Sequence, residues 1–284
     1  MEDETGRFTP FKCNERGKND GALIGMHGGM KEERGDCAGE IRACSCTDKG
    51  VRDLNEDSCG AFTLSCPGGR LFLLAVADGL GGHPAGEVAS DLAINALRSA
   101  VSMAVETLSV MDPSSLRMVL ASGFSYANRE VIRHASISPG CAGMGTTMVA
   151  AIINPQGEGV VGNVGDSRAY LVGGEIRRIT RDHSRVQEMV DQGLISWEEA
   201  GSHPLRHIVT RILGRPEDTP DLCPFHLGDD LLVLCSDGLL DGISEQELHS
   251  IALHHPLPLI CRLLVENARG RSRDNITVVA AGRR

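Results

Sequence analysis

Apolar residues gather in short runs that alternate with longer amphipathic stretches along this chain of 284 residues. The most informative run is LFLLAVA at residues 71–77, which leads directly into Asp78 and Gly79. Such a run stopping at Asp-Gly indicates a buried strand, although a short buried helix has the same periodicity. Because Gly permits a tight turn and close backbone approach, the Asp78 carboxylate and the Gly79 carbonyl can point at one place. We therefore expect an oxygen-lined metal site beyond this strand.

Other runs of strand length lie on both sides of this one. A CPGG sequence at 66–69 predicts a hairpin turn into it, and similar short turns recur between later runs. The pattern predicts a largely antiparallel sheet. The remaining predicted strands are residues 41–48, 58–64, 146–153, 159–164, 170–172, 175–179, 231–238 and 276–280.

Apolar positions at helical spacing predict four helices. Two long ones cover residues 87–108 and the stretch from Pro113 to the SPG stop at 138–140, the second with Asp112 as its cap. Two shorter ones cover 245–254 and 257–268. Between the predicted strands at 175–179 and 231–238 the pattern weakens to short helical pieces around 186–190 and 197–200. A long excursion of this kind in a compact domain is typically functional or mobile. We interpret residues 182–214 as a flap.

Four aspartates flank the predicted strands. Asp78 and Asp237 each follow an apolar run and precede Gly, whereas Asp57 and Asp274 stand just before a run. A fold that gathers these strand ends places several carboxylates together. Two carboxylates ~4 Å apart repel by roughly 4 kcal/mol at an effective dielectric of about 20, so the cluster must bind cations or take up protons. Oxygen ligands with few His or Cys nearby favour Mg²⁺ or Mn²⁺, and four acids suit two ions.

Paired divalent ions predict phosphate ester hydrolysis. They lower the pKa of bound water from about 15.7 toward ~7 and clamp both oxygens of an in-line displacement at phosphorus, so the expected nucleophile is a hydroxide bridging the two ions. Arg52, five residues before Asp57, is suited to bind the phosphate oxygens. Taken singly, an Asp-Gly pair is more often a turn and an arginine more often solvated. Their joint occurrence favours the site.

The net charge and the apolar content of the chain disfavour some classes of binding partner. A formal charge of -10 and a pI near 5.5 disfavour nucleic acid, because phosphate backbones are bound by clustered Lys and Arg. No apolar run approaches the ~18 residues of a membrane span, so no membrane partner is expected. The first ten residues lack the basic and apolar parts of a signal peptide. We therefore expect a cytoplasmic protein.

We assign no catalytic role to the amino-terminal segment or to the cysteines. Residues 1–40 hold eight glycines and fifteen charged residues without apolar periodicity, which predicts a disordered extension before a catalytic domain at 41–284. The ten cysteines are scattered and are expected to be reduced. Cys37, Cys44 and Cys46 are close in sequence, but the lack of a CxxC pair and of a fourth ligand disfavours zinc.

The motifs of this chain, taken together and in order, resemble the metal-dependent type 2C (PPM) family of serine/threonine protein phosphatases in its compact bacterial form. The resemblance covers about residues 41–282. It implies an α+β fold, a four-layer α-β-β-α sandwich with two antiparallel sheets flanked by helices and the metals at one end. It also implies Mn²⁺ or Mg²⁺ as cofactor. The motifs are TDKGVRDLNED, VADGLGGH, GMGTT, GNVGDSRAY, TRDHS, HPLRHIVTRILG, LCSDGL and SRDNIT.

The resemblance also implies roles for the acids. By motif position, Asp78 resembles the ligand that bridges the two ions, with Gly79 contributing its carbonyl. Asp237 and Asp274 resemble ligands of one ion.

Three further assignments follow from motif position alone. Asp57, with Glu56 acting through water, resembles the shell of the other ion. Asp166 in GDSR resembles the ligand of a weaker third ion. Arg52 matches the family's phosphate-binding arginine.

The proton donor to the leaving group is the open assignment. Some members of the family place a His directly after the bridging Asp-Gly, whereas this chain has Leu80 there and His83 three residues later. His83 is a candidate general acid, and a loop histidine that packs or caps the next helix is the alternative we favour. For His183 in TRDHS we expect a structural hydrogen bond.

Two other functions are weighed against a protein phosphatase. A binding module that has lost catalysis would lack a ligand, and all of the ligands are present here. A hydrolase for small phosphate esters would use the same chemistry. As partners of a monomeric enzyme we expect phosphorylated proteins and a cognate Ser/Thr kinase.

Overall fold

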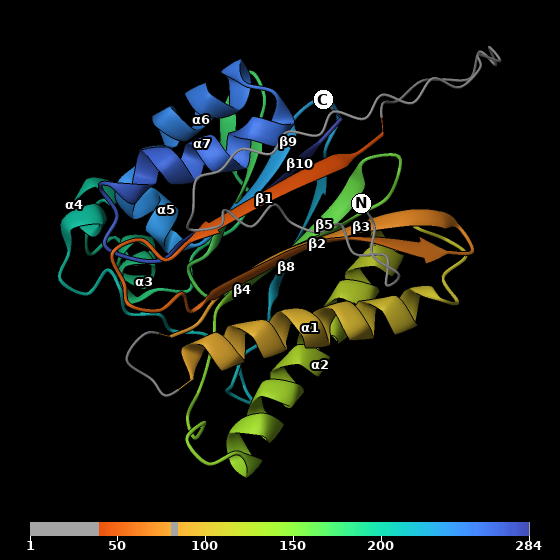
Figure 1. Cartoon of the computed structure of the whole chain (residues 1–284), viewed down its shortest axis with the longest axis horizontal. Helices are drawn as coiled ribbons and strands as arrows, with labels where there is room; N and C mark the ends of the chain where they lie inside the picture. Colours follow the sequence, from red (N-terminus) through yellow and green to blue (C-terminus); the bar gives the residue numbers. More distant parts are fainter. Residues whose placement is uncertain (1–39, 81–84, 284) are drawn as a thin grey trace, which may run out of the picture.

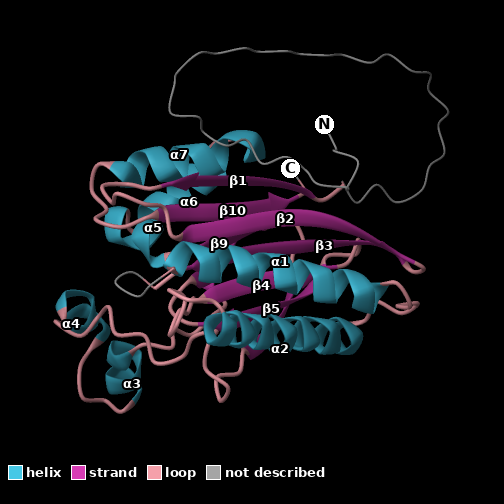
Figure 2. Ribbon diagram, turned by 60° about the horizontal axis from the view of Figure 1, so that its bottom comes forward, coloured by secondary structure: helices cyan, strands magenta, loops and turns pink. Residues whose placement is uncertain are grey.

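The computed structural model describes residues 40–80 and 85–283. The expected extension at 1–40 therefore lies, apart from Glu40, outside the described residues, and so does His83. Within this part of the chain the fold has four layers, with one five-stranded sheet facing another and helices on both outer sides (Figures 1 and 2). The predicted α-β-β-α sandwich is confirmed.

Every strand pair in the two sheets is antiparallel. The first sheet has the order β1 (Arg42–Asp48), β10 (Ile276–Gly282), β9 (Leu231–Cys235), β6 (Arg168–Val172) and β7 (Ile176–Arg178). The second has the order β2 (Asp57–Cys66), β3 (Gly69–Asp78), β4 (Met148–Ile153), β5 (Glu158–Val164) and β8 (Asp221–His226).

The helices divide between the two outer faces. The second sheet is covered by α1 (Gly86–Val105) and α2 (Pro113–Ile137), and the first by α5 (Asp237–Gly242), α6 (Glu245–His254) and α7 (Leu257–Arg269) (Figure 1). The flap contains α3 (Arg185–Asp191) and α4 (Trp197–Ser202), which stand away from the sheets at one end of the molecule (Figure 2).

Three apolar clusters match the three contacts between layers. One joins α1 and α2 to the second sheet, one joins α5, α6 and α7 to the first, and one lies between the sheets. The run LFLLAVA explains this arrangement, because alternate residues of β3 contribute to the helix-facing and sheet-facing clusters. A strand buried on both faces appears in the sequence as a continuous apolar run.

Local sequence accounts for the helix boundaries. Asp112 caps α2 by accepting a hydrogen bond from the Ser115 amide at 2.8 Å, and Pro113 occupies the first turn, as predicted. Helix α1 is long and apolar enough to cross a membrane by length and composition alone. In this fold its apolar face packs on β2, β3 and α2, as a core helix does.

Two elements were missed by the sequence pattern. β8 is an edge strand whose residues alternate poorly in burial and include Pro224, which an edge position tolerates. Helix α5 is a short helix with a glycine at its second and its last position, directly after β9. Asp237, expected at the end of a strand, is therefore the first residue of a helix.

Cys44 of β1 and Cys261 of α7 lie in contact, with their sulfur atoms 2.8 Å apart. Cys44 also donates to the Leu257 carbonyl, and Cys261 donates to the Cys44 carbonyl. All eight cysteines of the described residues are free thiols, in agreement with the reduced state expected. Cys37 lies outside the described residues.

Candidate active site

The predicted acids come together where the two sheets end beside the flap. Asp57 and Asp78 are direct cross-strand partners at the ends of β2 and β3. Asp237 follows β9 and Asp274 precedes β10, and these two strands are paired neighbours in the opposite sheet. Antiparallel pairing within each sheet and packing between the sheets therefore bring four strand ends to one place.

Burial and the neighbouring charges raise the pKa values of Asp57 and Asp78. Burial, and then the charges of Asp57, Asp237, Asp166 and Asp274, raise the pKa of Asp78 well above its ordinary value. Burial raises the pKa of Asp57 to about 7, opposed by hydrogen bonds from Thr277 and Ser236 and reinforced by Asp237 and Asp274. Mutual repulsion of this kind marks a functional site that favours cations.

Asp237 and Asp166 show the same effect. Burial, and then the charges of Asp274 and Asp241, raise the pKa of Asp237 to about 6. Burial and the Asp237 charge also raise the pKa of Asp166 well above its usual range. Asp166 therefore belongs to the same electrostatic cluster, on the side that faces the flap.

Two oxygens of this cluster fit a cation. The Oδ1 atoms of Asp57 and Asp237 are buried and have no hydrogen-bond partner. An unpartnered buried carboxylate oxygen is costly, and an oxygen-only donor set suits Mg²⁺ or Mn²⁺. Over the described ranges, no three His, Cys, Asp or Glu side chains converge as a ready ligand set. The fit therefore rests on donor chemistry and on the two unpartnered oxygens.

Arg52 lies at the cluster and pairs with one of its acids. Its Nη2 donates to Oδ2 of Asp274 at 2.7 Å, and its Nε donates to the Arg273 carbonyl at 3.2 Å. The Arg52 side chain is 47% exposed. Because it lies at the surface beside the buried acids, it can contact a phosphate group that approaches them.

Glu56 and Gly79 are held together by the backbone. The Gly79 amide donates to the Glu56 carbonyl at 3.1 Å. A Cβ at Gly79 would lie 2.2 Å from the Gly86 carbonyl oxygen, so only glycine fits. The Glu56 side chain faces Gly86 in turn, and its pKa is raised by burial and then by Glu87. Both residues lie where the sequence placed them, beside Asp57 and Asp78.

The sequence did not single out the residues that hold these acids in place. Asn275 is buried and accepts from the Glu56 amide at 2.8 Å. Its Nδ2 donates to the carbonyls of Lys49 and Leu54, both at 2.9 Å. Ser236 donates to Oδ2 of Asp57 at 2.8 Å. The signal for Asn275 was its position in SRDNIT, one residue after a predicted ligand.

The flap is joined to the site through GDSR and TRDHS. Asp182 binds the Arg168 guanidinium with three contacts of 2.7–3.1 Å. Ser184 caps α3 through the Gln187 amide. At the other end of the flap, Thr146 and Leu213 exchange two backbone hydrogen bonds, while Thr146 also donates through Oγ1 to the Asp78 carbonyl.

His183 has a structural role, as expected. It is 2% exposed, and burial lowers its pKa. Its Nδ1 accepts from the Gly165 amide at 3.2 Å, which assigns the ring proton to Nε2, 3.1 Å from Oδ2 of Asp221. A neutral imidazole held in this way links the flap to β8 and is not directed at the acid cluster.

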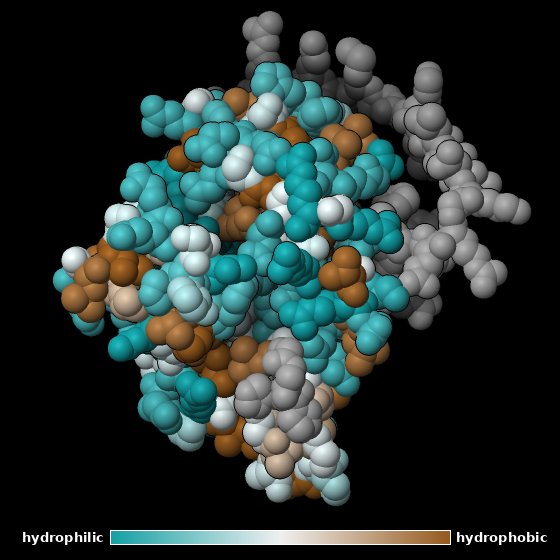
Figure 3. All heavy atoms as spheres, turned by 90° about the vertical axis from the view of Figure 1, so that its left-hand side faces the viewer, coloured by the Kyte–Doolittle hydropathy of each residue, from teal (hydrophilic) through white to brown (hydrophobic). Residues whose placement is uncertain are grey.

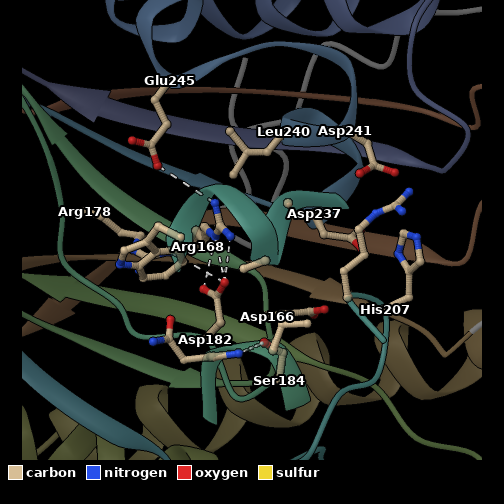
Figure 4. Close-up of a pocket in the computed structure, with 16 residues that line it drawn as sticks. Asp166, Arg168, Arg178, Asp182, Ser184, His207, Asp237, Leu240, Asp241 and Glu245 are labelled. Atoms are coloured by element: carbon tan, nitrogen blue, oxygen red, sulfur yellow. Dashed lines mark hydrogen bonds and ion pairs between the residues drawn. The ribbon is translucent and has the colours of Figure 1, made fainter. Parts of the chain in front are cut away.

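A cavity of about 610 Å³ adjoins the acid cluster under the flap (Figure 4). Asp166 and Asp237 line it on the side of the cluster, and Trp197 and His207 line it from the flap. His207 contributes a favourable charge to Asp237. This histidine was not among the sequence candidates, since HPLRHIVTRILG carries no periodicity that would place it.

Comparison with known proteins gives the site a context. Residues 50–263 match the family model described as protein phosphatase 2C. The serine/threonine phosphatase stp of Listeria innocua is 39% identical over 210 residues, which cover 72% of this chain and 80% of that protein.

Solved structures agree with the fold. Serine/threonine phosphatase Stp1 from Staphylococcus aureus is 32% identical, with a TM-score of 0.75 over 92% of this chain and 99% of that one. The catalytic domain of serine/threonine protein phosphatase PstP in complex with two manganese ions is 35% identical, with a TM-score of 0.72 over 86% and 98%.

Proposed function

The chain belongs to the protein phosphatase 2C family, and we propose that its acid cluster is where it hydrolyses phosphoserine and phosphothreonine in proteins. It is a metal-dependent serine/threonine protein phosphatase, like the relatives that it matches. The observation that carries the assignment of the site is the meeting of Asp57, Asp78, Asp237 and Asp274, where burial and then the neighbouring carboxylate charges raise the pKa values of Asp57, Asp78 and Asp237.

The same four aspartates would hold two Mn²⁺ or Mg²⁺ ions. The manganese pair in the PstP catalytic domain supports this number. We propose that Asp78 is shared between the ions, with Gly79 contributing through its carbonyl and Glu56 through water. Asp166 would hold a third. When bound, such ions neutralise the acids and activate water for attack on phosphorus.

The side chains around the acid cluster contribute to the reaction by positioning the phosphate group and the acids. Arg52 lies at the surface beside the acids, where its guanidinium can bind two phosphate oxygens and stabilise their developing charge. Its present partner, Asp274, holds the side chain over the site. Ser236 and Thr277 orient Asp57 from the opposite sheet.

Protein substrates are favoured over small phosphate esters by the surface around the site. Large apolar side chains are exposed in the loop that carries Arg52, where Val51 is 69% and Leu54 63% exposed. The flap exposes Trp197 at 51% and Ile208 at 47%. Figure 3 shows this end of the molecule, with apolar groups scattered among hydrophilic ones. A polypeptide can cover such groups, whereas a small phosphate ester cannot.

Phosphate release from a phosphothreonine peptide tests the proposal. We expect turnover in Mn²⁺, none in EDTA, and a loss of at least about 100-fold for Asp78→Asn, because removing a ligand costs more than removing a residue behind it. Asp53→Asn, an exposed acid in the loop before Asp57, is the matched control and should keep its activity. Turnover that persists in EDTA would contradict the proposal. Faster turnover of a nucleotide or sugar phosphate would favour the small-ester hydrolase.

The cellular setting is part of the proposal. Relatives named as serine/threonine phosphatases act on phosphoproteins, and a cognate Ser/Thr kinase would generate the phosphoproteins that this enzyme consumes. We propose that the enzyme works as a monomer in the cytoplasm. Elution as a single-chain species in size-exclusion chromatography with light scattering would support the first of these two points.

A further inference from the structure

The cavity under the flap has walls of different charge. Asp166, Asp237 and Asp241 line it from the body of the molecule, and Arg206 and His207 line it from the flap. Figure 4 shows His207 on the same side as Asp237 and Asp241, with the Arg168–Asp182 pair across the cavity. Because Asp166 and Asp237 belong to the acid cluster and also line the cavity, a peptide whose phosphate lies at the cluster can extend its neighbouring residues into the cavity. Its volume of about 610 Å³ falls in the range of ligand sites.

Most of the arginine side chains that line this cavity already bind a carboxylate of the protein. Arg168 is bound by Asp182 and lies 3.9 Å from Glu245. Arg178 lies 3.6 Å from the same Asp182, and its guanidinium stacks 4.7 Å from the centre of the Trp197 ring. Held on one side by a carboxylate and on the other by an aromatic face, Arg178 forms a fixed wall.

Arg206 is the exception. Its side chain is exposed, and within the described ranges no carboxylate lies within ion-pair distance of it. It follows helix α4 and is fixed only through its backbone, whose amide donates to the His203 carbonyl at 3.1 Å. An exposed, unpaired guanidinium that lines a cavity beside the acid cluster is placed to bind an anion.

We propose that Arg206, assisted by His207, forms an anion subsite that selects phosphopeptides carrying a second negative group near the phosphorylated residue. The proposal rests on the proposed function, because the peptide is located by its phosphate at the acid cluster. The ligand chemistry is an anion within a few residues of the scissile phosphate. Its source is either an Asp or Glu side chain or a second phosphate.

A peptide series tests the subsite. One phosphothreonine peptide is prepared with Ala, Asp, Lys or phosphoserine at each position from three before to three after the phosphothreonine. We expect kcat/KM to be about threefold to tenfold higher for Asp than for Ala at one or two adjacent positions, through KM. Arg206→Ala should bring this ratio close to one, and Arg206→Lys should keep most of it. Arg177→Ala is the matched control, an exposed arginine of the same strand as Arg178 that does not line the cavity.

Binding provides a second measurement that does not depend on turnover. The same peptides, with a non-hydrolysable phosphonate in place of the threonine phosphate, should bind Mn²⁺-loaded protein with the same Asp preference. A larger preference for phosphoserine than for Asp identifies a second phosphate as the source, and equal preference identifies acidic side chains.

The possible outcomes separate the two proposals. If wild-type enzyme treats Asp, Ala and Lys peptides alike, or if Arg206→Ala keeps the Asp preference, the subsite is wrong while the phosphatase remains. If no peptide in the series releases phosphate in Mn²⁺, the proposed function itself fails.

Discussion

Asn275 shows how one neutral residue organises a charged site. Its amide group makes three hydrogen bonds to the backbone of the loop that carries Arg52 and Glu56. The backbone amide of Asn275 also donates to Oδ1 of the neighbouring Asp274 at 2.8 Å. One side chain thus fixes the loop of the second sheet relative to the strand end of the first.

Asn275→Ala should therefore weaken both the fold and the site. Three backbone groups lose their side-chain partner, and we expect the free energy of unfolding to fall by about 2–4 kcal/mol. Urea denaturation measures this change, and calorimetric titration with Mn²⁺ should show weaker binding. Asn267→Ala is the control, because Asn267 lies exposed on α7 and bonds only within its own helix. Equal stability of the two variants would contradict the role of Asn275.

At the residue scale the sequence predicted the acids better than their supports. Asp57, Asp78, Asp237 and Asp274 were recognisable because a carboxylate recurs beside four apolar runs, although an Asp-Gly pair taken singly is more often a turn. Asn275 and Ser236 were not, because a hydrogen bond across two sheets depends on the packing of those sheets. No spacing along the chain encodes that packing.

Among the elements, β9 and α5 are joined by a tightly packed turn. The chain turns directly from a buried strand into a helix at Asp237, and Gly238 makes the turn fit against β10. A Cβ on Gly238 would lie 2.0 Å from the Asn275 carbonyl oxygen. No side chain can be placed there without moving the strand end that carries Asp274.

Gly238→Ala should separate these two strand ends. We expect a loss of stability of about 2–4 kcal/mol and weaker Mn²⁺ binding, because overpacking against backbone cannot be relieved by a side-chain rotation. Thermal unfolding with and without Mn²⁺ measures both effects. Gly174→Ala, where nothing lies within 4 Å, should change stability by about 0.5 kcal/mol or less. A Gly238→Ala protein as stable as that control would disprove the constraint.

Elements with clear periodicity were predicted, and elements defined by their neighbours were not. Helix α6 was predicted at its observed bounds, and α2 was predicted with its cap. Strand β8 was not predicted from the sequence because an edge strand needs no apolar alternation. Helix α5 was not predicted because its length is set by the two elements that it joins and not by its own helix propensity.

For the molecule as a whole, the acid cluster is a source of instability when no cation neutralises it. The folded-state pKa of Asp57 is about 7 and that of Asp237 about 6, both above the ordinary value of 3.8. An acid with a raised folded-state pKa favours folding while it is protonated. Its contribution is fully present below about pH 4 and is lost as the pH rises through the folded pKa values.

In EDTA, the acid cluster should therefore lower stability between pH 5 and pH 8. A shift of one pKa unit corresponds to about 1.4 kcal/mol, so the combined loss should amount to a few kcal/mol. Urea midpoints at the two pH values measure it, and Asp57→Asn should reduce the difference because the neutral amide does not titrate. Saturating Mn²⁺ should restore stability most at pH 8. The same pH dependence in the variant and the wild type would exclude Asp57 as the cause.

The architecture was predicted as a whole through the resemblance, and it is confirmed. The residues alone supported a largely antiparallel sheet with helices but not its division into two sheets. That division requires knowing which face of each strand meets which layer, and runs that are apolar on both faces, such as LFLLAVA, conceal it.

Thr146 gives the flap a mechanical property. It is bonded on one side to Leu213, where the flap returns to the body, and on the other to the Asp78 carbonyl. Thr146 thus connects the end of the flap to the backbone of Asp78 through hydrogen bonds. We therefore expect a displacement of the flap end at Leu213 to shift the backbone of Asp78, which would couple the capture of a substrate under the flap to the position of this carboxylate.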